Sequence, residues 1–232
     1  MKWTNKLATQ LLWSGEISNR AEKQVVADKL AAMVKDGQTI GAGSGSTSFL
    51  ALQAIAARVQ EEGLNCRIIP TSKEIEMSAS ILGLQVTSLM SDKPDWYFDG
   101  ADEVDGGKNL IKGRGGAMYR EKLVMSCAAQ SYILVDQSKF VKKLGKKFDV
   151  PVEVQQEALH YAETQLGLLG ANTVNLRLAE KKDGPVITES GNFILDCNFS
   201  EIGSDLESKI KNLTGVIESG LFWGYNPEIL SN

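Results

Sequence analysis

The stretch TIGAGSGSTSFLALQAIAARV, residues 39–59, joins two segments whose apolar residues recur at different intervals. Residues 39–42 form a short apolar run that is typical of a buried strand, whereas residues 48–59 carry apolar positions at helical spacing. The glycine-rich segment GSGST, residues 43–47, separates them. This order predicts a strand that passes through a glycine turn directly into a helix.

The same alternation of short strands and helices continues along the first two thirds of the chain. We predict further helices at residues 21–35, 73–82 and 119–130, and further strands at residues 66–70, 85–89, 95–98 and 132–135. Short apolar strands that alternate with helices favour a parallel sheet with helices on both faces. The expected fold class is therefore α/β, with a Rossmann-like sheet.

The pattern changes near Pro151. Predicted strands at 151–154, 173–178 and 193–197 and predicted helices at 158–169 and 206–212 follow in the order β-α-β-β-α. This order is typical of a small α+β, ferredoxin-like unit. Residues 215–230 are strand-like again, and we expect them to return to the first sheet. We thus predict a Rossmann-like catalytic domain, residues 1–150 and 214–232, and a small α+β domain, residues 151–213.

Composition narrows the class of protein. The 232 residues are 43% hydrophobic and 23% charged with a net charge of -4, which is ordinary for a globular protein and argues against nucleic acid as a partner. The cysteines Cys66, Cys127 and Cys197 lack CxxC spacing, so we predict reduced thiols and no zinc site. Residues 1–18 do not resemble a signal peptide, and no run is long enough to span a bilayer. We expect a cytoplasmic chain without a membrane partner.

GSGST is the first candidate site. Its position between a strand and a helix directs backbone N–H groups and the positive end of the helix dipole toward a ligand, so Ser44, Gly45, Ser46 and Thr47 are candidates to bind a phosphate or carboxylate. It is not a Walker loop, because no lysine precedes Ser46, and it lacks the third glycine of the dinucleotide fingerprint. A tight turn with a serine N-cap is the alternative.

The stretch DGADEVDGGKNLIKGRGGAMYREK, residues 99–122, is the second candidate. Asp99 and Asp102 follow the predicted strand 95–98 at the carboxyl edge of the sheet, where doubly wound folds bind ligands and where GSGST is also expected. KGRGG, residues 112–116, runs into the next predicted helix, whose first turn contains Glu121. A solvated charged loop with turn glycines is the alternative.

Lys139 follows the predicted strand 132–135 at the same edge, although it is equally compatible with an ordinary surface lysine. The single histidine, His160, lies on the predicted helix 158–169, far from these loops. A general base at the sheet edge must therefore be a carboxylate or a lysine. The acidic stretch does not match a calcium loop, because Ala101 occupies the third position from Asp99, so we predict no metal site.

Together these motifs resemble the type A ribose-5-phosphate isomerases. The segments that carry the resemblance, in the order and spacing of that family from about residue 21 onward, are GSGST, DGADEVDG, IKGRGGA, REK, DQSK, PVEV, GNFILD and GLF. The resemblance implies interconversion of ribose 5-phosphate and ribulose 5-phosphate in the pentose phosphate pathway through a cis-enediolate, without cofactor or metal. It implies a small-molecule sugar phosphate as the substrate, and we expect a homodimer or homotetramer.

The resemblance also implies roles for individual residues. Glu121 corresponds to the base that moves a proton between C2 and C1, Asp99 to a residue that helps open the furanose ring, and Lys112 to a cation beside the developing oxyanion. Such a reaction needs one carboxylate base and fixed positive charge near the oxygen. The substrate-binding positions implied are Ser44, Gly45, Ser46, Thr47, Asp99, Gly100, Ala101, Asp102, Lys112, Gly113, Arg114, Gly115 and Lys139.

Arg114 departs from the family pattern, which usually has a glycine there. Its side chain either narrows the site or adds a contact to an anion, and its presence tests whether that backbone needs a positive φ. Two other functions stay open. One is a non-catalytic sugar-phosphate sensor, although no DNA-binding segment is visible. The other is a transferase that forms a covalent adduct on a glutamate, which turnover without a second substrate would exclude.

Overall fold

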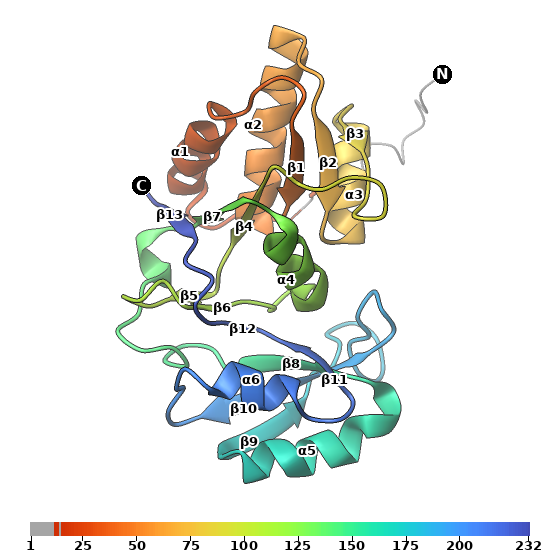
Figure 1. Cartoon of the computed structure of the whole chain (residues 1–232), viewed down its shortest axis with the longest axis vertical. Helices are drawn as coiled ribbons and strands as arrows, with labels where there is room; N and C mark the ends of the chain where they lie inside the picture. The colour runs from red at the N-terminus through yellow and green to blue at the C-terminus, as the bar shows by residue number, and fades with distance from the viewer. Residues whose placement is uncertain (1–11, 14) are drawn as a thin grey trace. The chain divides into compact units, whose positions relative to one another are not determined.

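The computed structural model describes residues 12–13 and 15–232, and its first sheet is a parallel sheet of six strands in the order β13-β7-β4-β1-β2-β3 (Figure 1). The strands are β1 (Thr39–Ala42), β2 (Arg67–Pro70), β3 (Gln85–Val86), β4 (Trp96–Gly100), β7 (Gln130–Leu134) and β13 (Glu228–Leu230). The strand order reverses between β1 and β4, as in a doubly wound Rossmann sheet. The predicted α/β class is confirmed.

Helices flank this sheet. They are α1 (Arg20–Ala31), α2 (Ser46–Glu62), α3 (Lys73–Ile81) and α4 (Met118–Cys127). The apolar face of α2, including Leu52 and Ile55, is fully buried in the core of this sheet. Gly41 of β1 shows how tightly α4 packs, because a Cβ atom there would lie 2.6 Å from the Val124 side chain. Because Gly41 and Ile40 are successive residues of β1 and point to opposite faces of the sheet, α2 and α4 cover different faces.

A second sheet has the antiparallel order β11-β8-β10-β9. Its elements are β8 (Val150–Val154), α5 (Leu159–Leu168), β9 (Ala171–Leu176), β10 (Phe193–Phe199), α6 (Leu206–Lys211) and β11 (Val216–Ser219). This βαββαβ order is that of a ferredoxin-like unit, which confirms the predicted small α+β fold. Its core contains Val152, Leu166, Leu195 and Ile210.

The expectation that residues 215–230 return to the first sheet is wrong for most of that stretch. Only β13 pairs with β7, whereas β11 pairs with β8. The reason is that every residue of β8 is buried, so its backbone needs hydrogen-bonding partners on both edges. β10 provides one partner strand and β11 the other.

A small antiparallel sheet in the order β12-β6-β5 was not predicted. Its strands are β5 (Glu103–Val104), β6 (Leu110–Ile111) and β12 (Leu221–Phe222). Strands of two residues are too short to show a period of two in the sequence. They matter because β6 leads directly into Lys112 and the glycine loop.

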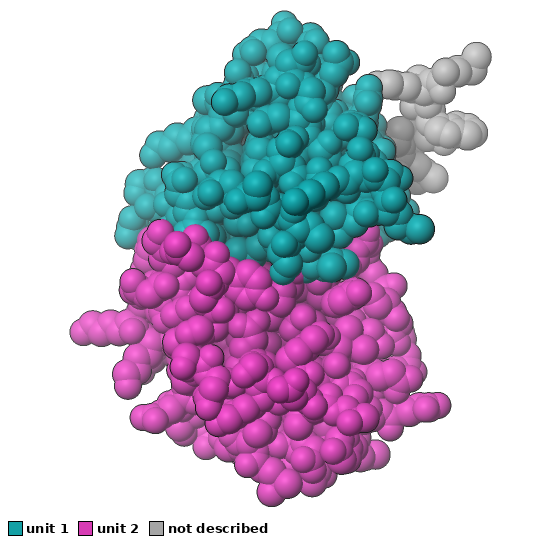
Figure 2. All heavy atoms as spheres, in the orientation of Figure 1, with its two compact units in different colours: residues 1–100, 123–138, 227–232 teal, residues 101–122, 139–226 magenta. Residues whose placement is uncertain are grey.

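The chain forms two compact units (Figure 2). The first consists of Met1–Gly100, Leu123–Ser138 and Pro227–Asn232, and the second of Ala101–Lys122 and Lys139–Asn226. These bounds differ from those of the predicted domains because β5, β6, β11 and β12 all lie within the second unit. The division into a Rossmann-like catalytic domain, residues 1–150 with 214–232, and a small α+β domain, residues 151–213, stays a prediction.

No helix in the described part of the chain combines the length and apolar character needed to cross a membrane. The prediction about a signal peptide concerns residues 1–18, most of which lie outside the described residues.

Candidate active site

The GSGST loop joins β1 to α2, and the helix begins at Ser46, two residues earlier than predicted. Its N-cap is Gly45 rather than a serine, with φ 94°, a conformation that favours glycine. Since glycine has no side chain, it does not cap the N–H groups of the first turn. The positive end of α2 is thus suited to bind an anion.

Two further side chains support this loop. The Ser44 hydroxyl lies 3.0 Å from Thr71 Oγ1, and Thr71 donates to the Ala42 carbonyl at 3.0 Å. The buried Lys23 of α1 donates from Nζ to Ser46 Oγ at 3.3 Å. Lys23 was not predicted as a site residue, although a lysine in helical phase with Val26 and Leu30 lies on the buried face of α1. That spacing is the signal that would have found it.

Asp99 is fully buried and lies within β4, not after it as predicted. Its carboxylate accepts hydrogen bonds from Ser48 Oγ at 3.2 Å, from the Gly100 N–H at 2.7 Å and from the Tyr97 hydroxyl. Gly43 makes room for it, because a Cβ atom on Gly43 would lie 2.0 Å from Asp99 Cγ.

The carboxyl ends of β1 and β4 adjoin in the first unit, since Ala42 pairs with Phe98 in the register of the sheet. Strand order reverses at this point, and ligands of open α/β sheets bind at such a switch point. GSGST and Asp99 therefore lie at the same edge of the sheet, as predicted, although Asp99 is the penultimate residue of its strand.

In the second unit, Lys112 and Glu121 form a buried ion pair. Lys112 Nζ lies 3.2 Å from Glu121 Oε2, with 3% and 6% of the respective side chains exposed. Lys112 directly follows β6, and Glu121 lies in the first turn of α4. Removing both charges from water costs free energy, so a buried ion pair contributes little net stability. A buried pair of opposite charges is therefore a candidate for catalytic residues. The pair places a carboxylate base beside a fixed cation.

Arg114 and Lys139 each form a cation–π contact with the ring of Phe148. Arg114 Cζ lies 5.5 Å and Lys139 Nζ 5.6 Å from the ring centroid. The buried Glu103 accepts a hydrogen bond from the Phe148 N–H at 3.0 Å and so fixes the residue that carries the ring. Arg114 and Phe148 line a cavity of about 590 Å³ that also includes Asp102.

The glycine loop tolerates Arg114 for a conformational reason. Gly113 and Gly116 have φ of 96° and 82°, in the region that favours glycine, whereas Arg114 is not among the described residues with positive φ. A side chain is therefore sterically acceptable at Arg114. Its backbone N–H donates to Asp102 Oδ2 at 3.3 Å.

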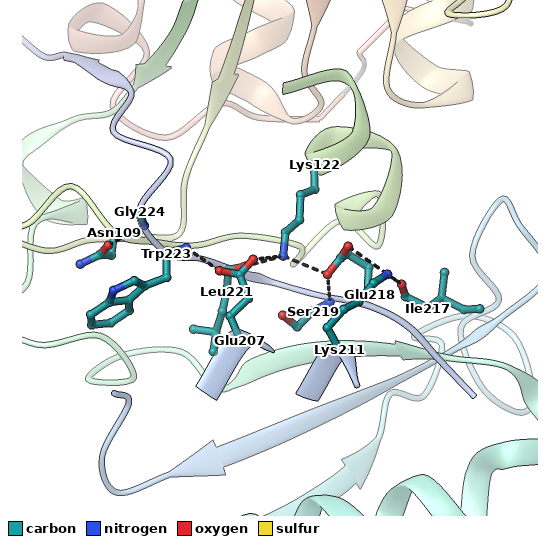
Figure 3. A network of polar contacts seen from close by, with 10 residues as sticks. All are labelled: Asn109, Lys122, Glu207, Lys211, Ile217, Glu218, Ser219, Leu221, Trp223 and Gly224. Atoms are coloured by element: carbon teal, nitrogen blue, oxygen red, sulfur yellow. Dashed lines mark hydrogen bonds and ion pairs between the residues drawn. The ribbon is translucent and has the colours of Figure 1, made fainter. Parts of the chain in front are cut away.

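Lys122, one residue after Glu121, is buried in a polar network of the second unit (Figure 3). Its Nζ lies 2.5 Å from Glu207 Oε1 and 3.0 Å from Glu218 Oε1, and it donates to the Leu221 carbonyl at 2.6 Å. These contacts fix the N-terminal part of α4 to α6, β11 and β12. Of the motif REK, only Glu121 was predicted to have a role, and Lys122 was not predicted.

Comparison with known proteins identifies the family. The family model for ribose 5-phosphate isomerase A (phosphoriboisomerase A) matches residues 67–231. A ribose-5-phosphate isomerase A from Methanothermobacter thermautotrophicus is 43% identical over 87% of this chain and 89% of its own length. The solved ribose 5-phosphate isomerase A of Methanocaldococcus jannaschii is 42% identical and superposes with a TM-score of 0.86, covering 88% of this chain and 92% of its own. The chain belongs to the ribose 5-phosphate isomerase A family.

A second solved ribose-5-phosphate isomerase, in complex with phospho-erythronic acid, is 34% identical with a TM-score of 0.87, over 90% of this chain and 93% of its own. The resemblance drawn from the motifs is thus confirmed. Membership in the ribose 5-phosphate isomerase A family makes an enzyme the favoured reading, and the sensor domain is not favoured.

The residues predicted from the family resemblance divide between the two units. The first unit contains Ser44, Gly45, Ser46, Thr47, Asp99 and Gly100, and the second contains Ala101, Asp102, Lys112, Gly113, Arg114, Gly115, Glu121 and Lys139. Within the units the structure brings GSGST to Asp99 and Lys112 to Glu121, and it places Arg114 and Lys139 each against the ring of Phe148. His160, which was assigned no role, has a side chain that is 94% exposed.

Proposed function

We propose that this chain interconverts D-ribose 5-phosphate and D-ribulose 5-phosphate, with Glu121 as the base. The observation that carries the proposal is the buried Lys112–Glu121 pair, in which Nζ and Oε2 are 3.2 Å apart. Abstraction of a proton α to a carbonyl needs a carboxylate in a site from which water is largely excluded and a positive charge near the oxygen. The Lys112–Glu121 pair has both properties.

The proposed proton transfer is balanced within the substrate. Glu121 takes the proton from C2 of the open-chain aldose, and the C2–H electrons form a C1–C2 double bond as O1 acquires negative charge. The Lys112 ammonium stabilises that oxyanion. A proton moves from O2 to O1, and Glu121 returns its proton to C1, which leaves the carbonyl at C2. No second substrate is consumed.

The other predicted residues receive supporting roles in this proposal. Asp99 assists ring opening, and Asp102 binds sugar hydroxyls. The phosphate binds at the GSGST loop, where the first turn of α2 and the Lys23 ammonium beside Ser46 both favour an anion. One similar ribose-5-phosphate isomerase was solved in complex with phospho-erythronic acid, which supports the proposal that this chain binds a phosphorylated compound.

A cytoplasmic location, the absence of a cofactor and a homodimer or homotetramer remain predictions. Light scattering coupled to size-exclusion chromatography would test the oligomeric state.

The decisive experiment is proton NMR of ribose 5-phosphate in heavy water with EDTA, comparing the wild-type protein with Glu121→Gln. We expect ribulose 5-phosphate with solvent deuterium at the exchanging carbon for the wild type and almost none for the variant. Glu163→Gln is the matched control, because Glu163 is an exposed glutamate of α5.

Loss of wild-type activity in EDTA would contradict the metal-free proposal. Line broadening by binding without conversion, in both proteins, would restore the sensor hypothesis. A requirement for a second sugar would point instead to the transferase.

A further inference from the structure

Arg177 directly follows β9 and is held rigidly by a neighbouring strand. Its Nε donates to Asp196 Oδ2 at 2.8 Å, and its Nη2 pairs with Asp196 Oδ1. Asp196 lies on β10, next to β9 in the sheet. Two parallel hydrogen bonds between a guanidinium and a carboxylate fix the plane of the arginine fork. The position of the third nitrogen, Nη1, is therefore fixed before it binds a partner.

That remaining nitrogen binds the glycine loop. Arg177 Nη1 donates to the Gly113 carbonyl at 2.9 Å and to the Arg114 carbonyl at 2.9 Å. The residues on either side of this contact are Lys112 and Gly115. Glycine-rich backbone has many accessible conformations, and Gly113 adopts φ 96°. The two hydrogen bonds from Arg177 therefore restrict the glycine loop at Gly113, one residue away from Lys112 of the buried ion pair.

The two carbonyl contacts also determine where the loop N–H groups point. None of the described peptide bonds is cis, and in a trans peptide the N–H points opposite to the C=O. With both carbonyls turned to Arg177, the N–H groups of Arg114 and Gly115 point away from it. The first of these reaches Asp102 Oδ2 at 3.3 Å. The Gly115 N–H therefore faces the same side of the loop as the Asp102 carboxylate.

We propose that Arg177 is a positioning residue for the isomerase reaction and that Asp196 is its support. It keeps Lys112 in place against Glu121 and directs the Gly115 N–H toward an oxygen of the bound sugar phosphate. This inference rests on the function proposed above. It differs from a simple strand-to-strand ion pair because two of the arginine's hydrogen bonds go to the loop and not to the sheet.

Arg58 offers a matched control. It also forms a fork with a carboxylate, at 2.8 Å and 3.3 Å to Glu62, and donates to a backbone carbonyl, that of Ala31, at 2.7 Å. Its contacts join α2 to the end of α1 and touch no loop of the candidate site. Arg58→Ala therefore removes the same kinds of bond as Arg177→Ala without freeing the glycine loop.

The experiment measures kcat and KM for ribose 5-phosphate, together with the thermal unfolding midpoint, for wild type, R177A, R177K and R58A. We expect kcat of R177A to fall about 100-fold, the usual effect of small misplacements of catalytic groups, while R58A stays within about twofold of wild type. Added guanidinium ion is expected to restore part of the kcat of R177A and to leave the kcat of R58A unchanged. R177K keeps the positive charge but cannot form the two parallel hydrogen bonds of the guanidinium group, so its kcat should fall at least about tenfold.

A kcat of R177A within about twofold of that of R58A, or the absence of guanidinium rescue, would overturn the inference. If R177A does not fold, R177K and D196N replace it, and wild-type kcat in both would equally overturn it. An inactive wild-type protein would instead refute the proposed function, so the two failures are distinguishable.

Discussion

The two units each contain a buried acid, and the two acids are held in different ways. Within the first unit, Asp99 accepts hydrogen bonds from Ser48, Tyr97 and Gly100, all groups without charge. Within the second unit, Glu121 lies against the Lys112 ammonium. Two of the donors to Asp99 lie within two residues of it in the same strand, so the geometry of β4 largely sets its place.

The Lys112–Glu121 pair depends on more of the chain. Its partners are separated by the glycine loop and by the start of α4. Its geometry therefore relies on contacts of the loop with Arg177 and of α4 with the Lys122 network. Asp99 is thus held in large part by neighbours in its own strand and by Ser48 of α2, whereas the position of Glu121 also depends on charged residues that are distant in sequence.

The largest expected effect is on Glu121 itself. Glu121→Gln keeps the size and an oxygen near Lys112 but removes the base, so kcat should fall about 1000-fold, within the usual range for general-base catalysis. Steady-state kinetics with ribose 5-phosphate measures it. A KM that rises while kcat is unchanged would mean that Glu121 binds substrate without moving a proton.

Asp99→Asn is expected to have a smaller effect on activity and little on stability. The amide oxygen still accepts from Ser48 and Gly100, and the amide nitrogen can donate to the Tyr97 hydroxyl, so the free energy of unfolding should change by about 1 kcal/mol or less. We expect kcat to fall about 100-fold, because the negative charge is lost.

Urea unfolding and kinetics on the same D99N preparation separate the two effects. A large loss of stability with normal kcat would make Asp99 a structural residue and remove it from the proposed mechanism.

Lys122→Met tests whether the ion pairs of Lys122 with Glu207 and Glu218 help to hold Glu121 in place. The change leaves Glu207 and Glu218 without the Lys122 ammonium, and breaking a buried ion pair typically costs about 3–5 kcal/mol of stability. Since the first turn of α4 loses an anchor, kcat should fall about tenfold. Lys211→Met is the control, because Lys211 also pairs with Glu218 but is 47% exposed, and exposed pairs contribute about 1 kcal/mol or less. Equal effects of both variants would contradict the anchoring role.

The same contrast explains what the sequence could predict. The strand–loop–helix order, the ferredoxin-like order and the meeting of GSGST with Asp99 follow from local apolar periods and from the rule that parallel strands end at one edge. These features depend on neighbours in the chain. The roles of Glu121 as the base and of Lys112 as the cation beside the oxyanion were predicted from the family resemblance and not from local patterns.

Long-range pairing was not accessible in this way. Nothing in the local pattern distinguishes a strand at residues 216–219 that pairs with β8 from one that returns to the first sheet. Lys23, Lys122 and Arg177 are charged residues whose partners lie far away in sequence, and each was hidden among ordinary charged positions. Only three-dimensional contacts show which oxygen atoms these cations bind.

The smallest expected effect compares a buried thiol in each unit. Burial raises the pKa of the Cys197 thiol, and the nearby Asp196 and Asp149 carboxylates raise it further. Burial also raises the pKa of Cys66, but there a backbone hydrogen bond from Gln38 opposes the shift. The neutral thiol is thus favoured in the folded state at both positions, and more strongly at Cys197.

The sign of the pH effect follows from the direction of these shifts. Unfolded cysteine loses its proton near pH 8.5, while a thiol with a raised pKa in the folded state keeps it. Stability is therefore fully present below about pH 8.5 and is lost as pH rises, by at most about 1.4 kcal/mol per pH unit for one thiol. Urea unfolding at pH 7.5 and pH 9.5 should show a smaller loss of stability in Cys197→Ala than in wild type, and an intermediate loss in Cys66→Ala. An identical pH dependence in wild type and Cys197→Ala would mean that burial in the second unit does not raise the pKa of the Cys197 thiol.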